Sequence, residues 1–458
     1  MTAANASRVI DARADADGTA GKAGSRGWYT VVLLSAVMML AYIDRGVIAL
    51  FVQPMKRDLG LTDTEVSVLL GFAFTFPYVV VGLPMSRIVD RGVRKYLVVG
   101  SLALWSLTTA LCGLAQNFWS LFVGRAVVGS SESVVTPAAI SLIADAIPPE
   151  RLPRAYAIYN GGITAGSALA LLIGGVLMGL LADIPSIELS GIGVLHSWHL
   201  VFMIVGIPGL LVAALIVVTV PEPLRRGGSQ PKGYPLREVF GSIVGQRALH
   251  LNLLTGMVLL SVVNQALGAW MPAFYERTYG WGPAISGPLL GMVSLGGAVV
   301  GLVSGAWLAE WFGKRRDDAN VRVLVLSQAL ALPLTLAGPL MPSPWLALAF
   351  GGVGGALGVM GGPAFVSALQ IATPNEMRGQ VNVLYATLVN VIGGSLGPTL
   401  TGLFTDHFVT SEADIRYALV AIKLLFGPAA LFFLWRAMKP YGAIHRERVD
   451  ESRRDAFS

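Results

Sequence analysis

The stretch MMLAYIDRGVIAL, from Met38 to Leu50, places two charged residues, Asp44 and Arg45, side by side within a run of apolar residues. A charged side chain at the centre of a bilayer costs about 2.5–3.5 kcal/mol on insertion scales, so such residues normally face a partner or a water-filled cavity. Adjacent residues on a helix point about 100° apart and do not pair with each other. We therefore expect each charge to find its partner on another helix.

This run belongs to a chain of 458 residues that is 54% hydrophobic and only 13% charged. Soluble domains carry about 25% charged residues, and a helix needs about 20 apolar residues to cross the hydrocarbon core of a bilayer. Six such runs begin between Trp28 and His199, and six more begin between Leu249 and Tyr417. The pattern predicts an all-α integral membrane protein with twelve transmembrane helices in two pseudo-symmetric six-helix bundles.

A polar stretch rich in glycine, proline and basic residues separates the two sets of runs. We expect a flexible tail at 1–27, a first bundle at 28–220, a linker at 221–248, a second bundle at 249–437 and a second tail at 438–458. The two halves echo each other, because spans 4 and 10 end in similar loops, IPPERLPR and ATPNEMRG. Weak internal repetition of this kind is typical of transporters built from two related bundles.

The net charge of +6 comes from basic residues that gather in alternate loops, such as DRGVRK at 90–95 and GKRRDD at 313–318. By the positive-inside rule this bias predicts that both termini and the central loop face the cytoplasm, in a multi-pass protein of the cell (inner) membrane. The same distribution argues against a nucleic-acid partner. The first 26 residues lack the apolar core of a signal peptide, so we expect the first span to remain in the mature protein.

Span 4, LFVGRAVVGSSESVVTPAAI, supplies partners for the two charges of span 1. Arg125 and Glu132 lie seven residues apart and so share one helix face with Thr136. Two interpretations stay open: a static buried salt-bridge network, or a network that exchanges partners as protons or substrate bind. Desolvation raises the proton affinity of a carboxyl group and a nearby arginine lowers it. An arginine that moves between Asp44 and Glu132 would therefore change which acid holds a proton.

The spans of the second half carry uncharged polar residues and no equivalent charged cluster. Together with Thr136 of span 4, they make the set of candidate substrate-cavity residues: Thr136, Asn264, Gln265, Gln370 and Asn390. These side chains either contact the substrate or form hydrogen bonds between helices. The one lysine of span 12, Lys423, is expected to extend its ammonium group toward the membrane interface.

Glycines recur at four-residue spacing in two spans of the second half, Gly297, Gly301, Gly305 and Gly354, Gly358, Gly362. Small residues on one helix face let two backbones approach closely where no hydrophobic effect drives their association. We expect these glycines to mark helix–helix contacts.

Four motifs resemble the major facilitator superfamily, and within it the Spinster-like (sphingolipid/lysolipid-type) transporters. They are YIDR at 42–45, PMSRIVDRGVRK at 84–95, GRAVVGSSESVVTPAAISLIADAIPPER at 124–151 and SWHLVFMIVGIPGLL at 197–211. The resemblance covers roughly Trp28 to Arg436. It implies a twelve-helix fold, alternating access and proton coupling.

The resemblance also assigns roles to individual residues. The coupling residues of the family fall on Asp44, Arg45 and Glu132, and its span-4 arginine falls on Arg125. The family's cytoplasmic gate motif, whose charges latch the two halves in the outward-open state, falls on Asp90, Arg91, Arg94 and Lys95. The chain departs from the usual glycines of these motifs at Ser86, at Gly92–Val93 and at Ser131.

The sequence therefore predicts a proton-coupled secondary active transporter that works by alternating access on a small amphiphilic, lipid-like or organic-anionic substrate. The alternative is an organic anion/proton symporter that takes up a carboxylate, because YIDR also occurs in such symporters of the superfamily. We expect no metal, no cofactor apart from protons as the coupling ion, and a monomer whose partners are the bilayer and a small molecule.

Two other classes of function are weaker candidates. GGSLG at 393–397 fits the nucleophile elbow of a hydrolase, but that motif requires a strand–turn–helix context with His and Asp partners. A channel requires rings of like polar groups around a continuous pore, whereas the two halves differ in their polar residues. We therefore expect neither an intramembrane enzyme nor a channel.

Overall fold

The computed structural model describes residues 24–191, 193–223, 236–374 and 377–457. Within these ranges twelve helical spans are long and apolar enough to cross a membrane. The predicted all-α fold with twelve spans is confirmed. The expected N-terminal tail lies outside the described residues as far as residue 23, and the expected linker does so over 224–235.

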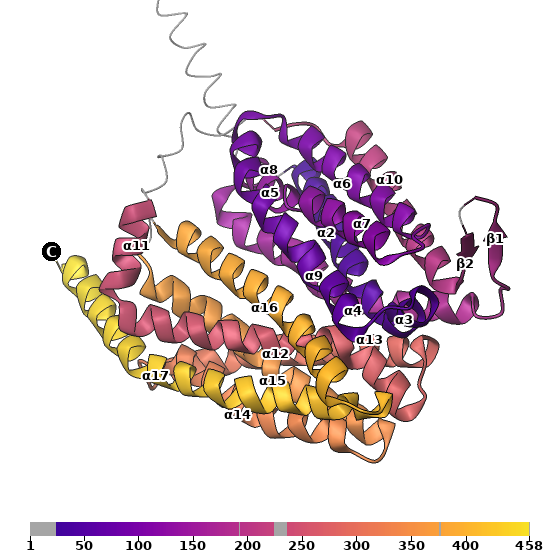
Figure 1. The fold of residues 1–458 in the computed structure, drawn as a ribbon. Helices are drawn as coiled ribbons and strands as arrows, with labels where there is room; N and C mark the ends of the chain where they lie inside the picture. The colour runs from indigo at the N-terminus through magenta and orange to yellow at the C-terminus, as the bar shows by residue number, and fades with distance from the viewer. Residues whose placement is uncertain (1–23, 192, 224–235, 375–376, 458) are drawn as a thin grey trace, which may run out of the picture.

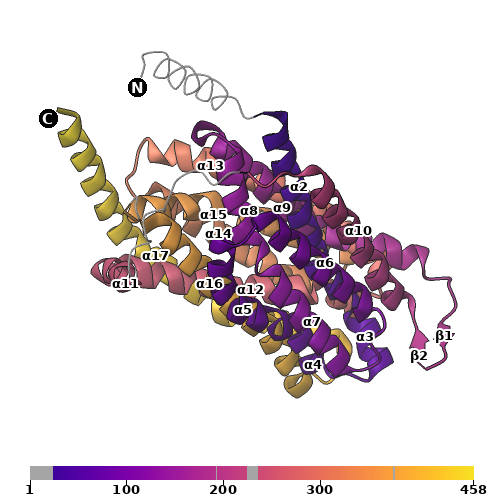
Figure 2. The same cartoon turned by 90° about the horizontal axis from the view of Figure 1, so that it is seen from above.

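The N-terminal half of the fold runs from α2 to α10 (Figure 1). Its elements are α2 (Ser25–Val47), η1 (Ile48–Phe51), α3 (Val52–Leu59), α4 (Asp63–Leu70), α5 (Phe72–Arg91), α6 (Arg94–Cys112), α7 (Phe118–Glu132), α8 (Val135–Ala146), η2 (Pro149–Arg151), α9 (Leu152–Leu180), β1 (Ile187–Leu189), β2 (Gly193–Leu195) and α10 (Ser197–Thr219). The short antiparallel hairpin of β1 and β2 stands apart from the helices in both views (Figures 1 and 2) and was not predicted from the sequence.

The C-terminal half runs from α11 to α17. Its elements are α11 (Leu236–Gly245), α12 (Arg247–Tyr279), α13 (Pro283–Gly313), α14 (Ala319–Ala337), η3 (Gly338–Leu340), α15 (Pro344–Ala372), α16 (Arg378–Phe408), η5 (Glu412–Asp414) and α17 (Ile415–Phe457). Helix α13 of this half packs on α9 of the N-terminal half, and α16 packs on α4 and α5. Helix α12 also contacts η1 and α3.

The outer faces of the helices are strongly apolar. Large side chains on several helices are more than 60% exposed, among them Trp119, Leu180, Val218 and Val303. Soluble monomers rarely expose contiguous apolar patches larger than a few hundred Å², and a hydrocarbon environment removes the cost of such exposure. The distribution agrees with a protein whose outer surface faces lipid.

The span-4 helix is interrupted next to Glu132. Helix α7 ends at Glu132, and the amide of Val134 donates to the carbonyl of Ser131, three residues back, across a distance of 3.4 Å. Pro137 has no N–H to donate to the carbonyl of Ser133, and a proline ring crowds the carbonyl four residues earlier. The predicted single face that runs on to Thr136 is therefore divided between α7 and α8.

The expected glycine contacts are found only in part. A Cβ atom at Gly301 would lie 2.4 Å from the carbonyl oxygen of Ala356, and one at Gly305 would lie 2.0 Å from that of Met360. These two glycines therefore permit α13 and α15 to pack closely. A Cβ atom at Gly358 or Gly362 of α15 would meet nothing within 4 Å, so the four-residue spacing alone did not identify the packed face.

Candidate functional site

Asp44 and Arg45 of α2 contact different partners, as their positions on a helix require. The Asp44 carboxylate is buried, accepts a hydrogen bond of 2.7 Å from the Thr109 hydroxyl of α6, and lies 3.6 Å from Arg125 Nη1 of α7. Arg45 donates to Glu132 Oε2 from both Nε (2.7 Å) and Nη2 (2.6 Å). The four charges predicted from spans 1 and 4 thus meet as two crossed pairs, which we call the charged cluster.

The charged cluster is incompletely bonded. Asp44, Arg125 and Glu132 are each 2–3% exposed. Among the described residues no hydrogen-bond partner is found for Asp44 Oδ2, Arg125 Nε or Glu132 Oε1. Buried polar atoms are nearly always satisfied in folded proteins, and an unmet buried hydrogen bond is destabilising. A network built only to hold two helices together would gain from satisfying these atoms.

Arg45 is the member of the cluster that reaches the surface, because 24% of its side chain is exposed. Three aromatic rings surround its guanidinium group, with centroids at 4.9 Å for Tyr42, 4.7 Å for Phe74 and 5.1 Å for Tyr78. Aromatic faces stabilise a cation without an anion, so this cage stabilises the charge of Arg45 in addition to Glu132.

Sequence reasoning missed most of this cage. The ring of Phe74 also lies 5.1 Å from the guanidinium of Arg125, so one aromatic residue touches both arginines. Phe74 and Tyr78 are four residues apart in α5, a spacing that places them on one helix face. That spacing was visible in the sequence, but nothing local to span 2 indicated that the face points at span 1.

The candidate substrate-cavity residues do not gather at one place. Gln265 lies over Gly394 beside Thr75 of the N-terminal half. Asn390 is exposed and donates its amide to the Ala386 carbonyl of its own helix.

The remaining candidates are spread over α8, α12 and α15. Gln370 is exposed near the end of α15, where its backbone carbonyl accepts from Arg378. Thr136 is half-buried on α8. Asn264 lines a separate pocket of the C-terminal half. Lys423 lines the same pocket and is only 8% exposed, so the expectation that it extends toward the membrane interface is wrong.

The gate motif makes its described contacts inside the N-terminal half. The buried guanidinium of Arg94 donates to Glu222 (2.8 Å) and to Asp145, and the Lys95 amide donates to the other carboxylate oxygen of Glu222 (2.8 Å). Arg91 is exposed, and the side chain of Asp90 lies outside the described residues. These contacts tie the start of α6 to the ends of α8 and α10.

A second ionic group joins the two halves and was not predicted. Arg277 at the end of α12 is bonded to both carboxylate oxygens of Asp63 (2.7 Å each) and to Gln53 Oε1. Lys56 lies 2.9 Å from Asp63 and 3.0 Å from Glu412. We call these five residues the inter-bundle cluster.

Asp406 of α16 strengthens the same end of the molecule. Its carboxylate accepts hydrogen bonds from the backbone amides of Asp63 (3.1 Å) and Thr64 (2.8 Å), at the N-terminus of α4. The first amides of a helix lack partners within the helix and carry partial positive charge. A side chain of one half thus caps a helix of the other, and this end of the interface is closed.

Comparison with known proteins agrees with the fold and the motifs. Residues 34–398 match the Major Facilitator Superfamily. The chain is 26% identical over 437 residues to an MFS-type efflux pump of Mycolicibacterium smegmatis, covering 93% of this chain and 96% of the pump. It is 24% identical over 406 residues to the gentisate transporter of Corynebacterium glutamicum, covering 86% and 84% of the two chains.

A solved structure is also similar. The crystal structure of a bacterial homolog of the human lysosomal transporter Spinster, inward-facing and unoccupied, superposes with a TM-score of 0.76 at 26% identity. The superposition covers 92% of this chain and 98% of the homolog. The Spinster-like resemblance predicted from the motifs is confirmed.

Proposed function

Because this chain belongs to the Major Facilitator Superfamily and is a secondary transporter of a small molecule, we propose that it couples transport to protons through its charged cluster. The proposed cargo is a small amphiphilic, lipid-like or organic-anionic compound. The observation that carries the proposal is the pairing of Arg45 with Glu132. Glu132 is buried, whereas 24% of the Arg45 side chain is exposed. A change of charge on Glu132 therefore acts directly on an exposed side chain.

The proposed mechanism depends on what a proton does to this pair. Protonation of Glu132 removes the charge that holds Arg45, while the aromatic cage keeps the arginine stabilised. Arg45 is then able to bind an anionic group or to move toward Asp44. The Asp44–Arg125 ion pair is loose, at 3.6 Å, and its carboxylate oxygen Oδ2 accepts no hydrogen bond from a described residue, which leaves Asp44 able to accept that approach.

We further propose that the present conformation faces the cytoplasm. The inter-bundle cluster closes the end that holds the loop between the first two spans, and the positive-inside rule places this loop outside. The inward-facing conformation of the Spinster homolog supports the same assignment. In the opposite conformation the inter-bundle cluster separates, and the gate motif around Arg94 would latch the halves together.

The test is cargo flux in proteoliposomes with and without an imposed pH gradient. Glu132→Gln removes the titrating group and keeps the size of the side chain, so we expect gradient-driven flux to fall to background. Asp44→Asn is expected to reduce flux and to change its pH dependence. The matched control is Glu310→Gln, the same change at an exposed acid of α13 that pairs with Lys314 on the same helix. If both cluster variants keep the wild-type pH profile, proton coupling at these residues is excluded.

A second candidate function is uptake of an aromatic or aliphatic carboxylate by proton symport. The similarity to the gentisate transporter over most of both chains favours it. The two candidates differ in cargo and share the coupling residues. A panel of lysolipids and organic acids, presented to the same proteoliposomes, separates them by which class accumulates when the gradient is applied.

A further inference from the structure

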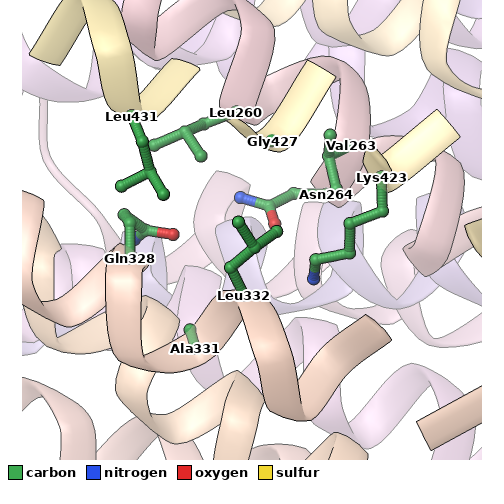
Figure 3. Close-up of a pocket in the computed structure, with 9 residues that line it drawn as sticks. All are labelled: Leu260, Val263, Asn264, Gln328, Ala331, Leu332, Lys423, Gly427 and Leu431. Carbon is green, nitrogen blue, oxygen red and sulfur yellow. The ribbon is translucent and has the colours of Figure 1, made fainter. Parts of the chain in front are cut away.

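A small pocket lies inside the C-terminal half, between α12, α14 and α17 (Figure 3). Its polar residues are Asn264, Gln328 and Lys423, and leucines such as Leu260, Leu332 and Leu431 form much of the rest of its wall. The free space is close to the size of a water molecule or one small functional group. None of the coupling residues of the N-terminal half is among its described lining residues.

Lys423 is the unusual member of this pocket. Its side chain is buried, and Figure 3 draws its ammonium group among the lining side chains. Among the residues that the structure describes, no carboxylate forms an ion pair with it. An isolated charge in an apolar bundle is costly unless it is paired and hydrogen-bonded. The pocket therefore presents a cation that lacks an anion.

Asn264 lies at the exposed mouth of the pocket. It is exposed, while its neighbours on the pocket wall, Leu260 and Val263, are buried. The next residue, Gln265, lies with Thr75 of α5 over Gly394. Gln265 points about 100° away from Asn264 on the helix, so the two amides face different neighbours. A ligand that reaches the exposed mouth of the pocket would meet Asn264 before Lys423.

The polar groups suit a singly charged planar acceptor. Gln328 donates its amide to the Gly358 carbonyl of α15 (2.8 Å), which fixes one side of the pocket. A single ammonium group balances one negative charge, and the leucine walls leave no room for a bulky dianion. A carboxylate fits both limits, and a charged hydrogen bond to it is stronger than a neutral one.

Resting on the proposed transport function, we propose that the Lys423 pocket binds the carboxylate of the cargo. Lys423 pairs with the carboxylate, and the Asn264 amide donates a hydrogen bond to it at the mouth. The apolar remainder of the cargo stays on the open face of α12. The coupling acid and the cargo-binding base then belong to different halves of the molecule.

The test measures binding to the purified full-length protein in nanodiscs, using hexanoate, acetate and the neutral control hexanol. Lys423→Met is expected to weaken hexanoate binding about 10-fold to 100-fold, the effect of losing a hydrogen bond to a charged group. Lys423→Arg keeps the charge and is expected to stay within about 3-fold of the wild type, since only the bond geometry changes. Lys314→Met, which removes an exposed lysine of the C-terminal half, is the matched control and is expected to bind like the wild type.

The acetate arm distinguishes two sources of the carboxylate. Hexanoate binding that is tighter than acetate binding, with both lost in Lys423→Met, supports the end of an amphiphilic cargo as the ligand. Equal affinities, again lost in Lys423→Met, support a site for free small carboxylates. Unchanged hexanoate binding in Lys423→Met, an equal loss of hexanol binding, or no carboxylate binding by the wild type overturns the proposal.

A second variant covers the case in which Lys423→Met does not fold. Asn264→Ala alters an exposed position and is expected to weaken hexanoate binding about 3-fold to 10-fold, as loss of one ordinary hydrogen bond does; unchanged binding contradicts the proposal. The two proposals have separate readouts: hexanoate binding by Lys423→Met tests this one, and the pH profile of flux in Glu132→Gln tests proton coupling. Lost hexanoate binding in Lys423→Met together with an unchanged pH profile in Glu132→Gln would overturn proton coupling alone.

Discussion

The first membrane span of each half carries two adjacent polar residues, which are charged in the N-terminal half and uncharged in the C-terminal half. Helix α2 holds Asp44 and Arg45 as neighbours, and α12 holds Asn264 and Gln265 as neighbours. Asp44 is buried against α6, the third span of its half, and Asn264 shares a pocket with Gln328 of α14, the third span of the other half. The same arrangement therefore carries full charges in one half and amides in the other.

Arg125 and Lys423 are both buried, but only Arg125 has a described carboxylate beside it. In the N-terminal half each buried arginine has a carboxylate beside it, so removing either partner leaves an uncompensated charge. Lys423, buried inside the C-terminal half, has no described acidic partner, so its removal leaves no charge behind. Deleting Arg125 and deleting Lys423 should thus have opposite consequences.

Arg125→Met is expected to have the largest effect on stability among these substitutions. It leaves Asp44 buried with only Thr109 as a described partner, so we expect a loss of about 3–5 kcal/mol in the free energy of unfolding. Lys423→Met is expected to be neutral or stabilising. Thermal unfolding in detergent measures both, and adding Asp44→Asn to Arg125→Met is expected to recover much of the loss. Equal destabilisation by the two single variants would contradict the division between the halves.

The inter-bundle cluster is the place where the two halves share charges. Arg277→Gln removes its paired bonds to Asp63, and we expect the closed end to lose about 1.5–3 kcal/mol of stabilisation, the value of a charged hydrogen bond. Spin labels at the exposed Arg57 and Ser411 then report a longer distance in a larger fraction of molecules.

Arg277→Lys serves as the control for this experiment, because it keeps the charge and loses the forked geometry. Its distance distribution is expected to lie between those of the wild type and Arg277→Gln. An unchanged distribution in Arg277→Gln would show that packing alone holds this end closed.

Glycine substitutions in the two halves test how closely the helices must pack around the charged cluster. A Cβ at Gly129 of α7 would lie 2.3 Å from the Phe74 carbonyl oxygen, so Gly129→Ala must push α5 away from the charged cluster. We expect a loss of about 1–3 kcal/mol in stability, as for other overpacked sites, together with reduced flux. Gly355→Ala of α15, where nothing lies within 4 Å, is the control and should match the wild type in thermal unfolding and transport.

The smallest expected effect belongs to Asn390. Its amide donates to the Ala386 carbonyl one turn earlier in α16, and its side chain is exposed. Asn390→Ala should change the free energy of unfolding by no more than about 0.5 kcal/mol and leave flux unaltered. A clear loss of flux without a loss of stability would instead assign Asn390 to the path of the cargo.

Some of these features could be predicted from the sequence and others could not. The apolar runs predicted all twelve spans, because a helix that crosses lipid must be long and apolar over its whole length. The charged residues of spans 1 and 4 were identified because charges stand out against such a background. Phe74, Thr109 and Gln53 gave no such signal, since aromatic and small polar residues are common in these helices for many reasons.

Predictions from the sequence were wrong or missing for residues whose contacts depend on how a helix is rotated and on where along it the residue lies. Lys423 lies inside a helix that runs on past the membrane, so extension of its side chain to the interface was a fair expectation, yet its face of α17 turns toward α12 and α14. Arg277 gave no signal in the sequence, and the last turn of α12 carries it into contact with Asp63.

The membrane location of this protein, its number of spans and its four isolated charges can be read from the amino-acid sequence alone, because each follows from the energy of placing a side chain in hydrocarbon. The pairing of Asp44 with Arg125 and of Arg45 with Glu132, and the shared ion pairs that close one end of the two halves, are visible only in the folded molecule. The reason is physical: insertion energy acts on each helix separately, whereas pairing depends on how each helix is rotated against its neighbours.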